Sequence, residues 1–146
     1  MKKAFTMIEL IFVVVILGIL ASIALPKFAM VKKNADVVSG RADVATIRAA
    51  IVSERQTQLV KGTNSYIPKL TPTGETDTLF QGDGTRTLLL YGISSGTGSG
   101  KWRKDGTDEM RYYYHVEGTD NTFDYNSTTG QFNCTSGNDC TGLSVQ

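Results

Sequence analysis

The chain has 146 residues, of which 40% are hydrophobic and 20% are charged, and its formal net charge is +1. Charge this close to zero offers no basis for nucleic-acid binding, which depends on a clear excess of basic residues. After a membrane segment of about 20 residues and its helical continuation are set aside, residues 62–146 form one small domain. A domain of that size needs outside support for its core.

The N-terminal segment is apolar and contains one carboxylate. Lys2 and Lys3 precede the predominantly apolar residues 5–25, which are interrupted by Glu9. That length suffices to span a bilayer, which takes about 20 residues, whereas the apolar part of a signal peptide covers roughly 7–15. A charge at the centre of a membrane helix costs about 2.5–3.5 kcal/mol. We therefore predict a retained transmembrane helix in which Glu9 has a dedicated contact.

A cleaved signal peptide is the alternative interpretation of this segment. The small residues Ser22 and Ala24 could precede a cut, which would leave a secreted β-rich binding module. A carboxylate near the start of such a segment is unusual, and the helical pattern continues beyond the supposed cut, so retention is favoured. N-terminal sequencing separates the two, because the mature chain begins at Phe5 in one case and at Leu25 in the other.

Residues 26–61 continue the helix in amphipathic form. Apolar residues recur every three or four positions, with a second apolar flank beside them, as in an amphipathic helix. The alanine-rich stripe consists of Phe28, Val31, Ala35, Val38, Ala42, Ala45, Ala49, Val52 and Leu59, and the flank of Val37, Val44, Ile47 and Ile51. We predict one helix from about Phe5 to Lys61. One side should pack on the C-terminal domain, and the stripe permits close approach of another surface. Pro26 removes a backbone hydrogen bond and predicts a kink, with Gly40 as a second weak point.

The remainder of the chain has the pattern of a small antiparallel sheet. Residues 63–87 are expected to form an extended loop with a short helical turn near 78–81, and residues 87–93 a buried strand or a short helix. Strands are predicted at 101–104, 109–117, 122–126 and 131–134, because aromatic and β-branched residues alternate there between glycine-containing turns. The expected fold is α+β, with three or four strands packed on the long helix.

Two cysteines lie close together near the C-terminus. Cys134 and Cys140 are six positions apart, and the membrane segment indicates an exported chain, so we predict a disulfide. A zinc or redox site is not expected, because the spacing is wrong and the single histidine, His115, is isolated in a predicted strand. The sequence shows no catalytic constellation, and we predict that the protein is not an enzyme.

Two further motifs have both a structural and a functional interpretation. Asp105, Asp108 and Asp120 lie near glycine-rich turns and are expected to shape those turns, with calcium binding as a weak alternative. Asn126 begins an Asn-Ser-Thr sequon, with Asp124 two residues before it, and could be glycosylated, although a hairpin loop that happens to contain these turn residues is the favoured interpretation.

The sequence Lys-Lys-Ala-Phe-Thr-Met-Ile-Glu-Leu, followed by the apolar run and Pro26, resembles the N-terminal signature of type IV pilins and of the pseudopilins of type II secretion and competence systems. The resemblance implies that a prepilin peptidase removes residues 1–4 by cutting between Ala4 and Phe5, and then methylates the new amine of Phe5. Ala4 stands where the family usually has glycine. Because alanine is also small, the cut is still expected between Ala4 and Phe5.

The resemblance also implies a structural role. The subunit would wait in the bacterial inner membrane as a single-pass protein, with its C-terminal domain in the periplasm, and polymerise through its helix with an assembly platform. Glu9 would neutralise the Phe5 amine of its own or a neighbouring subunit and set the register. The small domain and the short disulfide loop favour a pseudopilin; a pilin of a surface fibre is the alternative. Major pseudopilins of type II secretion often carry a calcium site, but their usual calcium-loop sequence is not evident here.

Overall fold

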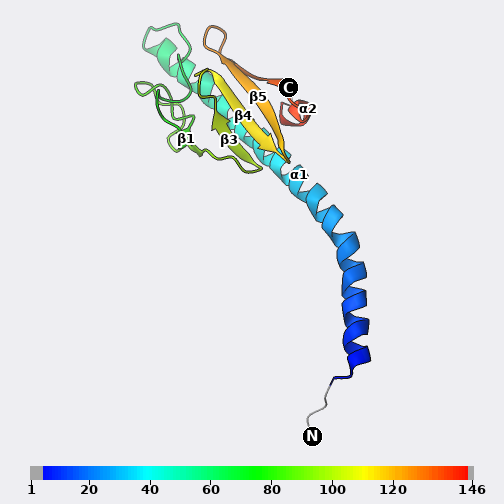
Figure 1. The fold of residues 1–146 in the computed structure, drawn as a ribbon. Coiled ribbons are helices and arrows are strands. Elements are labelled where there is room, and N and C mark those ends of the chain that lie inside the picture. The colour runs from blue at the N-terminus through cyan, green and yellow to red at the C-terminus, as the bar shows by residue number, and fades with distance from the viewer. Residues whose placement is uncertain (1–4, 145–146) are drawn as a thin grey trace. The chain divides into compact units, whose positions relative to one another are not determined.

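The computed structural model describes residues 5–144 and shows a long helix and an antiparallel sheet, the predicted α+β arrangement (Figure 1). The chain divides into two compact units, the first ending at Asn34 and the second beginning at Ala35. In chain order the elements are α1 (Met7–Val60), β1 (Thr78–Leu79), β2 (Ile93–Ser94), β3 (Lys101–Lys104), β4 (Arg111–Val116), β5 (Thr119–Asn126), β6 (Gln131–Ser136) and α2 (Cys140–Leu143).

Helix α1 confirms the prediction of one continuous helix. It begins and ends within two residues of the predicted limits and continues through Pro26. A proline removes one backbone donor but does not end a helix whose other hydrogen bonds persist. A kink or flexible point at Pro26 stays a prediction.

The second unit is built on a four-stranded sheet with the order β3-β4-β5-β6, all neighbours antiparallel. Strands β4 and β5 are joined by Glu117 and Gly118, whose φ angles of 43° and 81° are both positive, as a two-residue hairpin turn requires. The predicted strands are confirmed, with β4 shorter than the expected range 109–117 and with β5 and β6 longer than expected.

The inner face of this sheet packs on α1. Trp102 is fully buried, with the rings of Tyr114 and Phe123 centred 4.8 and 5.1 Å from its own. Such tilted and edge-on contacts are the favoured geometry of aromatic pairs. The helix contributes the flank Val44, Ile47 and Ile51, each at most 1% exposed.

The alanine-rich stripe lies outside this core. From residue 35 onward its members are all exposed: Ala35, Val38, Ala42, Ala45, Ala49, Val52 and Leu59. The second apolar flank of α1, and not this stripe, is therefore the side that packs on the sheet.

Gly40 proves to be a packing position of α1. A Cβ atom there would lie 2.3 Å from Cε1 of Tyr114 and 2.7 Å from Cδ2 of Leu143. Gly40 lets the helix, the sheet and α2 approach closely, so its interpretation as a weak point was incomplete.

Two local predictions were wrong, and one short element was not predicted. Residues 78–81 do not form a helical turn, because Thr78 and Leu79 form strand β1 and pair with Ser94 and Ile93 of β2. Most of residues 87–93 is neither strand nor helix, since only its last residue enters a strand. Helix α2 was not anticipated. These segments are short, and long-range pairing rather than local propensity decides their conformation.

Candidate assembly site

The first turn of α1 positions Glu9. The hydroxyl oxygen of Thr6 accepts a hydrogen bond from the backbone N–H of Glu9 at 3.3 Å, and the Thr6 carbonyl accepts one from Leu10 at 3.2 Å. Thr6 is thus the N-cap, and Thr-x-x-Glu has the spacing of a capping box. The carboxylate of Glu9 also lies where the helix dipole is positive. Sequence reasoning missed this cap, although the motif was visible.

Phe5 immediately precedes the cap. Its side chain is 74% exposed, and it stands four residues before Glu9. Ala4, the other residue of the predicted cut, lies outside the described residues. A new amine at Phe5 would therefore begin the chain within one turn of the capping residues.

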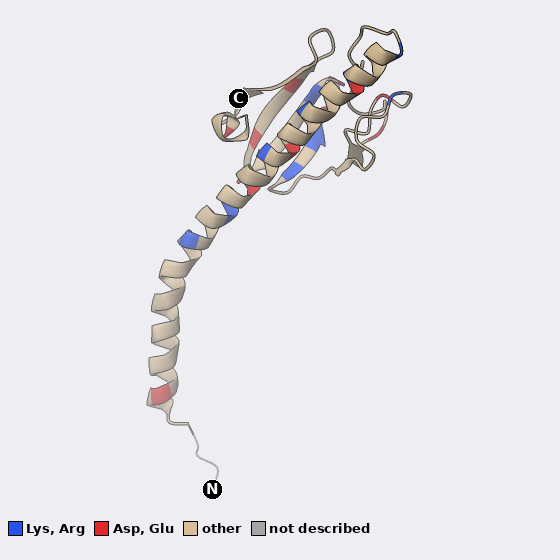
Figure 2. Cartoon of the chain, turned by 180° about the vertical axis from the view of Figure 1, so that it is seen from behind, with Lys and Arg blue, Asp and Glu red and all other residues tan. Residues whose placement is uncertain are grey.

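The helix surface of the first unit is apolar and is exposed in the described residues. Large apolar side chains from Met7 to Val31 are exposed, and the most apolar window of α1 has a mean hydropathy of 2.9 with none of its residues buried. Figure 2 shows the acidic position near the start of α1 and the concentration of charge in later parts of the chain. By length and composition α1 can cross a membrane.

The acidic residues of α1 that lie in the second unit all accept hydrogen bonds from segments that follow the helix. Ser99 donates to Asp36 at 2.5 Å, and the indole N–H of Trp102 donates to Asp43 at 2.9 Å. Burial raises the pKa of Asp43. Asp36 and Asp43 therefore fix the orientation of the helix against the loop before β3 and against β3 itself.

Glu54 forms the most deeply buried ion pair given by the described residues. Two nitrogens of the Arg86 guanidinium donate to its carboxylate in bidentate geometry, Nε to Oε1 at 2.7 Å and Nη2 to Oε2 at 2.5 Å. Arg86 also donates to the carbonyls of Ser65 and Tyr66, both at 3.0 Å. The hydrogen bonds with Glu54 raise the pKa of Arg86. This cluster ties the segment after α1 back onto the helix.

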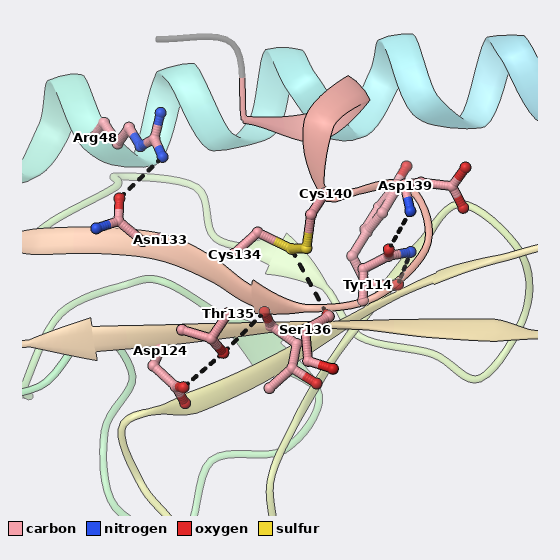
Figure 3. The surroundings of a disulfide bond; sticks show 11 residues. Arg48, Tyr114, Asp124, Asn133, Cys134, Thr135, Ser136, Asp139 and Cys140 are labelled. Carbon is pink, nitrogen blue, oxygen red and sulfur yellow. Dashed lines mark hydrogen bonds between the residues drawn. A yellow bond between two sulfur atoms is a disulfide. The ribbon is translucent and has the colours of Figure 1, made fainter.

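The predicted disulfide is present between Cys134 and Cys140 and joins β6 to α2 (Figure 3). The buried Asn121 accepts a hydrogen bond from the N–H of Asp139 at 2.9 Å, within the loop that the disulfide closes. Leu143 of α2 is fully buried. The disulfide therefore holds α2 in its place in the core.

Arginine side chains of α1 contact the same C-terminal segments. Arg48 donates to the Phe132 carbonyl at 2.9 Å and to Asn133 at 3.2 Å, the second contact being drawn in Figure 3. Arg41 donates to the Gly142 carbonyl at 2.7 Å. These bonds satisfy carbonyl groups on the free edge of β6 and in α2.

The aspartates named as weak calcium candidates have turn and ion-pair contacts. Asp105 accepts hydrogen bonds from the N–H groups of Thr107 and Asp108 and from the hydroxyl of Tyr113. The Tyr113 hydrogen bond is the main cause that holds the pKa of Asp105 well below its usual range. Asp108 accepts from the N–H of Met110.

Asp120 lies in β5, at the end of the sheet away from the Asp105 turn. Its Oδ2 is 2.8 Å from Nη2 of Arg103, and its Oδ1 is 2.9 Å from Nδ1 of His115. The His115 hydrogen bond lowers the pKa of Asp120. Across residues 5–144 no group of three or more candidate ligands could hold a metal ion. The structure therefore does not bring the three aspartates together as a site.

Asn126 is the exposed last residue of β5. Its side-chain oxygen accepts hydrogen bonds from the N–H groups of Thr128 and Thr129, at 2.9 and 3.2 Å, and so shapes the hairpin turn. Glycosylation at Asn126 stays a prediction.

Comparison with protein families identifies the start of the chain. Residues 1–25 match the model described as the prokaryotic N-terminal methylation motif. Comparison with curated proteins and with solved structures gives no match. The matched range includes the cap at Thr6 and the carboxylate at Glu9.

Proposed function

We propose that this type IV pilin-like protein, which carries the N-terminal methylation signature of type IV pilins and pseudopilins on a pilin-like α+β fold, is a pseudopilin of a type II secretion or competence system. It is a structural, non-enzymatic subunit that polymerises through α1. The small second unit and the short disulfide loop support the choice of pseudopilin.

The observation that carries this proposal is the pairing of an uncovered apolar helix with one carboxylate in its first turn. An apolar helix surface of this length needs lipid or other helices around it. Lipid covers it before assembly, and the helices of neighbouring copies replace lipid in the filament. Because the lipid is equally apolar, packing and polar contacts must favour assembly over the membrane.

Processing supplies the partner that Glu9 requires. Cleavage between Ala4 and Phe5 by a prepilin peptidase creates a positive amine at Phe5, which the same enzyme methylates. A buried carboxylate is tolerated when an opposite charge neutralises it. The Phe5 amine of a neighbouring copy fits this role, and the pairing fixes the axial step between copies.

Replacement of Glu9 tests this function. We expect Glu9→Val and the nearly isosteric Glu9→Gln to leave the subunit in the inner membrane but to lower filament yield strongly, because the amine of the neighbour then lacks its counter-charge. Mass spectrometry of the mature N-terminus, with methyl-Phe5 as the expected residue, separates failed assembly from failed processing. Filament yield at the level of the unaltered chain would contradict the proposal.

A pilin of a surface fibre is the second candidate. The Cys134–Cys140 disulfide is equally compatible with this candidate, because disulfides persist at the cell surface as well as in the periplasm. Shearing of intact cells distinguishes the candidates. A pseudopilin stays in the envelope and its deletion abolishes export of secreted proteins or DNA import, whereas a surface pilin appears in the sheared fraction.

A further inference from the structure

Leu90 and Tyr91 form an exposed apolar pair on the second unit. Their exposed fractions are 79% and 86%, although they are a leucine and a tyrosine next to each other in the chain. In the described part of this unit, the other exposed large apolar side chains belong to α1: Val38, Val52, Leu59 and Val60. Grouped apolar side chains at a surface mark interaction sites.

The loop that carries the pair is fixed on both sides. Before the pair, the N–H groups of Leu88 and Leu89 donate to the carbonyls of Gln81 and Phe80, at 2.9 and 3.1 Å. After it, Gly92 lies so close to β1 that a Cβ would be 2.6 Å from the Leu79 carbonyl oxygen. A side-chain pair held by such a backbone binds without a large ordering cost.

The exposed side of α1 is the second apolar surface of the same unit. Val38 and Val52 are 62% and 54% exposed. The small residues Ala42, Ala45 and Ala49 between them are also exposed and give large side chains access to the helix. The carboxylates of Asp36, Asp43 and Glu54 do not lie free on this surface, because all three are hydrogen-bonded to segments of the same unit that follow α1.

We propose that Leu90 and Tyr91 of one copy pack on α1 of the next copy, over residues 38–52, in the assembled filament. This proposal rests on the proposed polymerisation. The two surfaces differ, so the contact is heterologous, and a heterologous contact that does not close into a ring repeats along a helical filament. A second copy is therefore the occupant that accounts for both exposed apolar surfaces of the unit.

The size of the contact fits an auxiliary role. An aromatic side chain buries about 150–250 Å², whereas a stable interface buries roughly 800 Å² on each partner. The pair therefore strengthens and orients copies that the membrane-spanning part of α1 already brings together, and it does not by itself form a dimer.

The first experiment removes the pair from the full chain. We expect Leu90→Ser with Tyr91→Ser to lower filament yield by about tenfold or more, as for truncation of a covered aromatic side chain, while the amount of subunit in the membrane is unchanged. Val60→Ser is the matched control, because Val60 is 90% exposed but lies outside residues 38–52. Leu90→Met with Tyr91→Phe should retain assembly.

The outcomes separate this contact from the proposed function. If the unaltered chain forms filaments and the double serine variant forms them equally well, the contact is wrong and the proposed function stands. If the unaltered chain forms no filament, the proposed function fails and this contact fails with it.

The second experiment identifies the occupant by cross-linking. In the described structure no free cysteine is present, so Tyr91→Cys and Val52→Cys introduce the reactive pair. Oxidised filaments of the chain with both changes should give a ladder of linked copies, and the chain with Val60→Cys in place of Val52→Cys should not. Linkage of Tyr91→Cys only to another protein, or to Tyr91→Cys of another copy, would overturn the proposal.

Discussion

The two parts of α1 differ in what covers their apolar side chains. In the first unit the apolar side chains are exposed, and under the proposed function lipid or other copies cover them. In the second unit Val44, Ile47 and Ile51 are buried by the chain's own sheet. The comparison teaches that one continuous helix can owe its stability to the fold in one part and to assembly in the other.

The largest expected effect comes from paired truncations in the two parts. Ile47→Ala should lower the free energy of unfolding of the second unit by about 2–5 kcal/mol, because it opens a cavity in the core. Ile16→Ala, at a side chain 40% exposed in the first unit, should leave that free energy unchanged. Urea unfolding followed by the fluorescence of the single, buried Trp102 measures both. Equal losses of unfolding free energy in the two variants would contradict the difference between the two parts of α1.

Removal of the disulfide should have a smaller effect on the same unit. Cys134→Ser with Cys140→Ser should lower the free energy of unfolding by about 2–3 kcal/mol, since the closed loop is short. Because Leu143 follows the disulfide directly, hydrogen exchange should increase first in α2. Exchange and unfolding that match the unaltered chain would show that core packing alone holds α2.

The smallest expected effect is the response of the second unit to acid. The pKa of Asp105 is depressed from its ordinary value of 3.8, first by the hydrogen bond from Tyr113. A depressed carboxyl pKa contributes stability above the ordinary value, and this is lost as the pH falls through the folded pKa. Asp105→Asn retains an acceptor for the N–H groups of Thr107 and Asp108. We expect its unfolding midpoint to fall less than that of the unaltered chain between neutral pH and about pH 2. If the unfolding midpoints of the two chains depend on pH in the same way, Asp105 does not contribute to the acid response.

Sequence patterns predicted the long elements because their signals are local. The apolar run and the repeat of three and four positions specify α1, and alternating aromatic residues specify β3 to β6. They also predicted two of the contacts, the disulfide and the packing of one helix side on the sheet. The Thr-x-x-Glu spacing at Thr6 is a local signal of the same kind, and the N-cap that it indicates was not predicted.

What the sequence by itself determined is therefore the helix, the sheet, the disulfide and the membrane-compatible start with Glu9. Tertiary structure alone decided which side of α1 is covered, that Gly40 is a close contact with Tyr114, and that Leu90 and Tyr91 are exposed. The physical reason is that periodicity reports which residues share a face, whereas burial depends on what the rest of the chain places against that face. In the first unit that face is exposed in the described residues, and under the proposed function lipid and then neighbouring copies cover it.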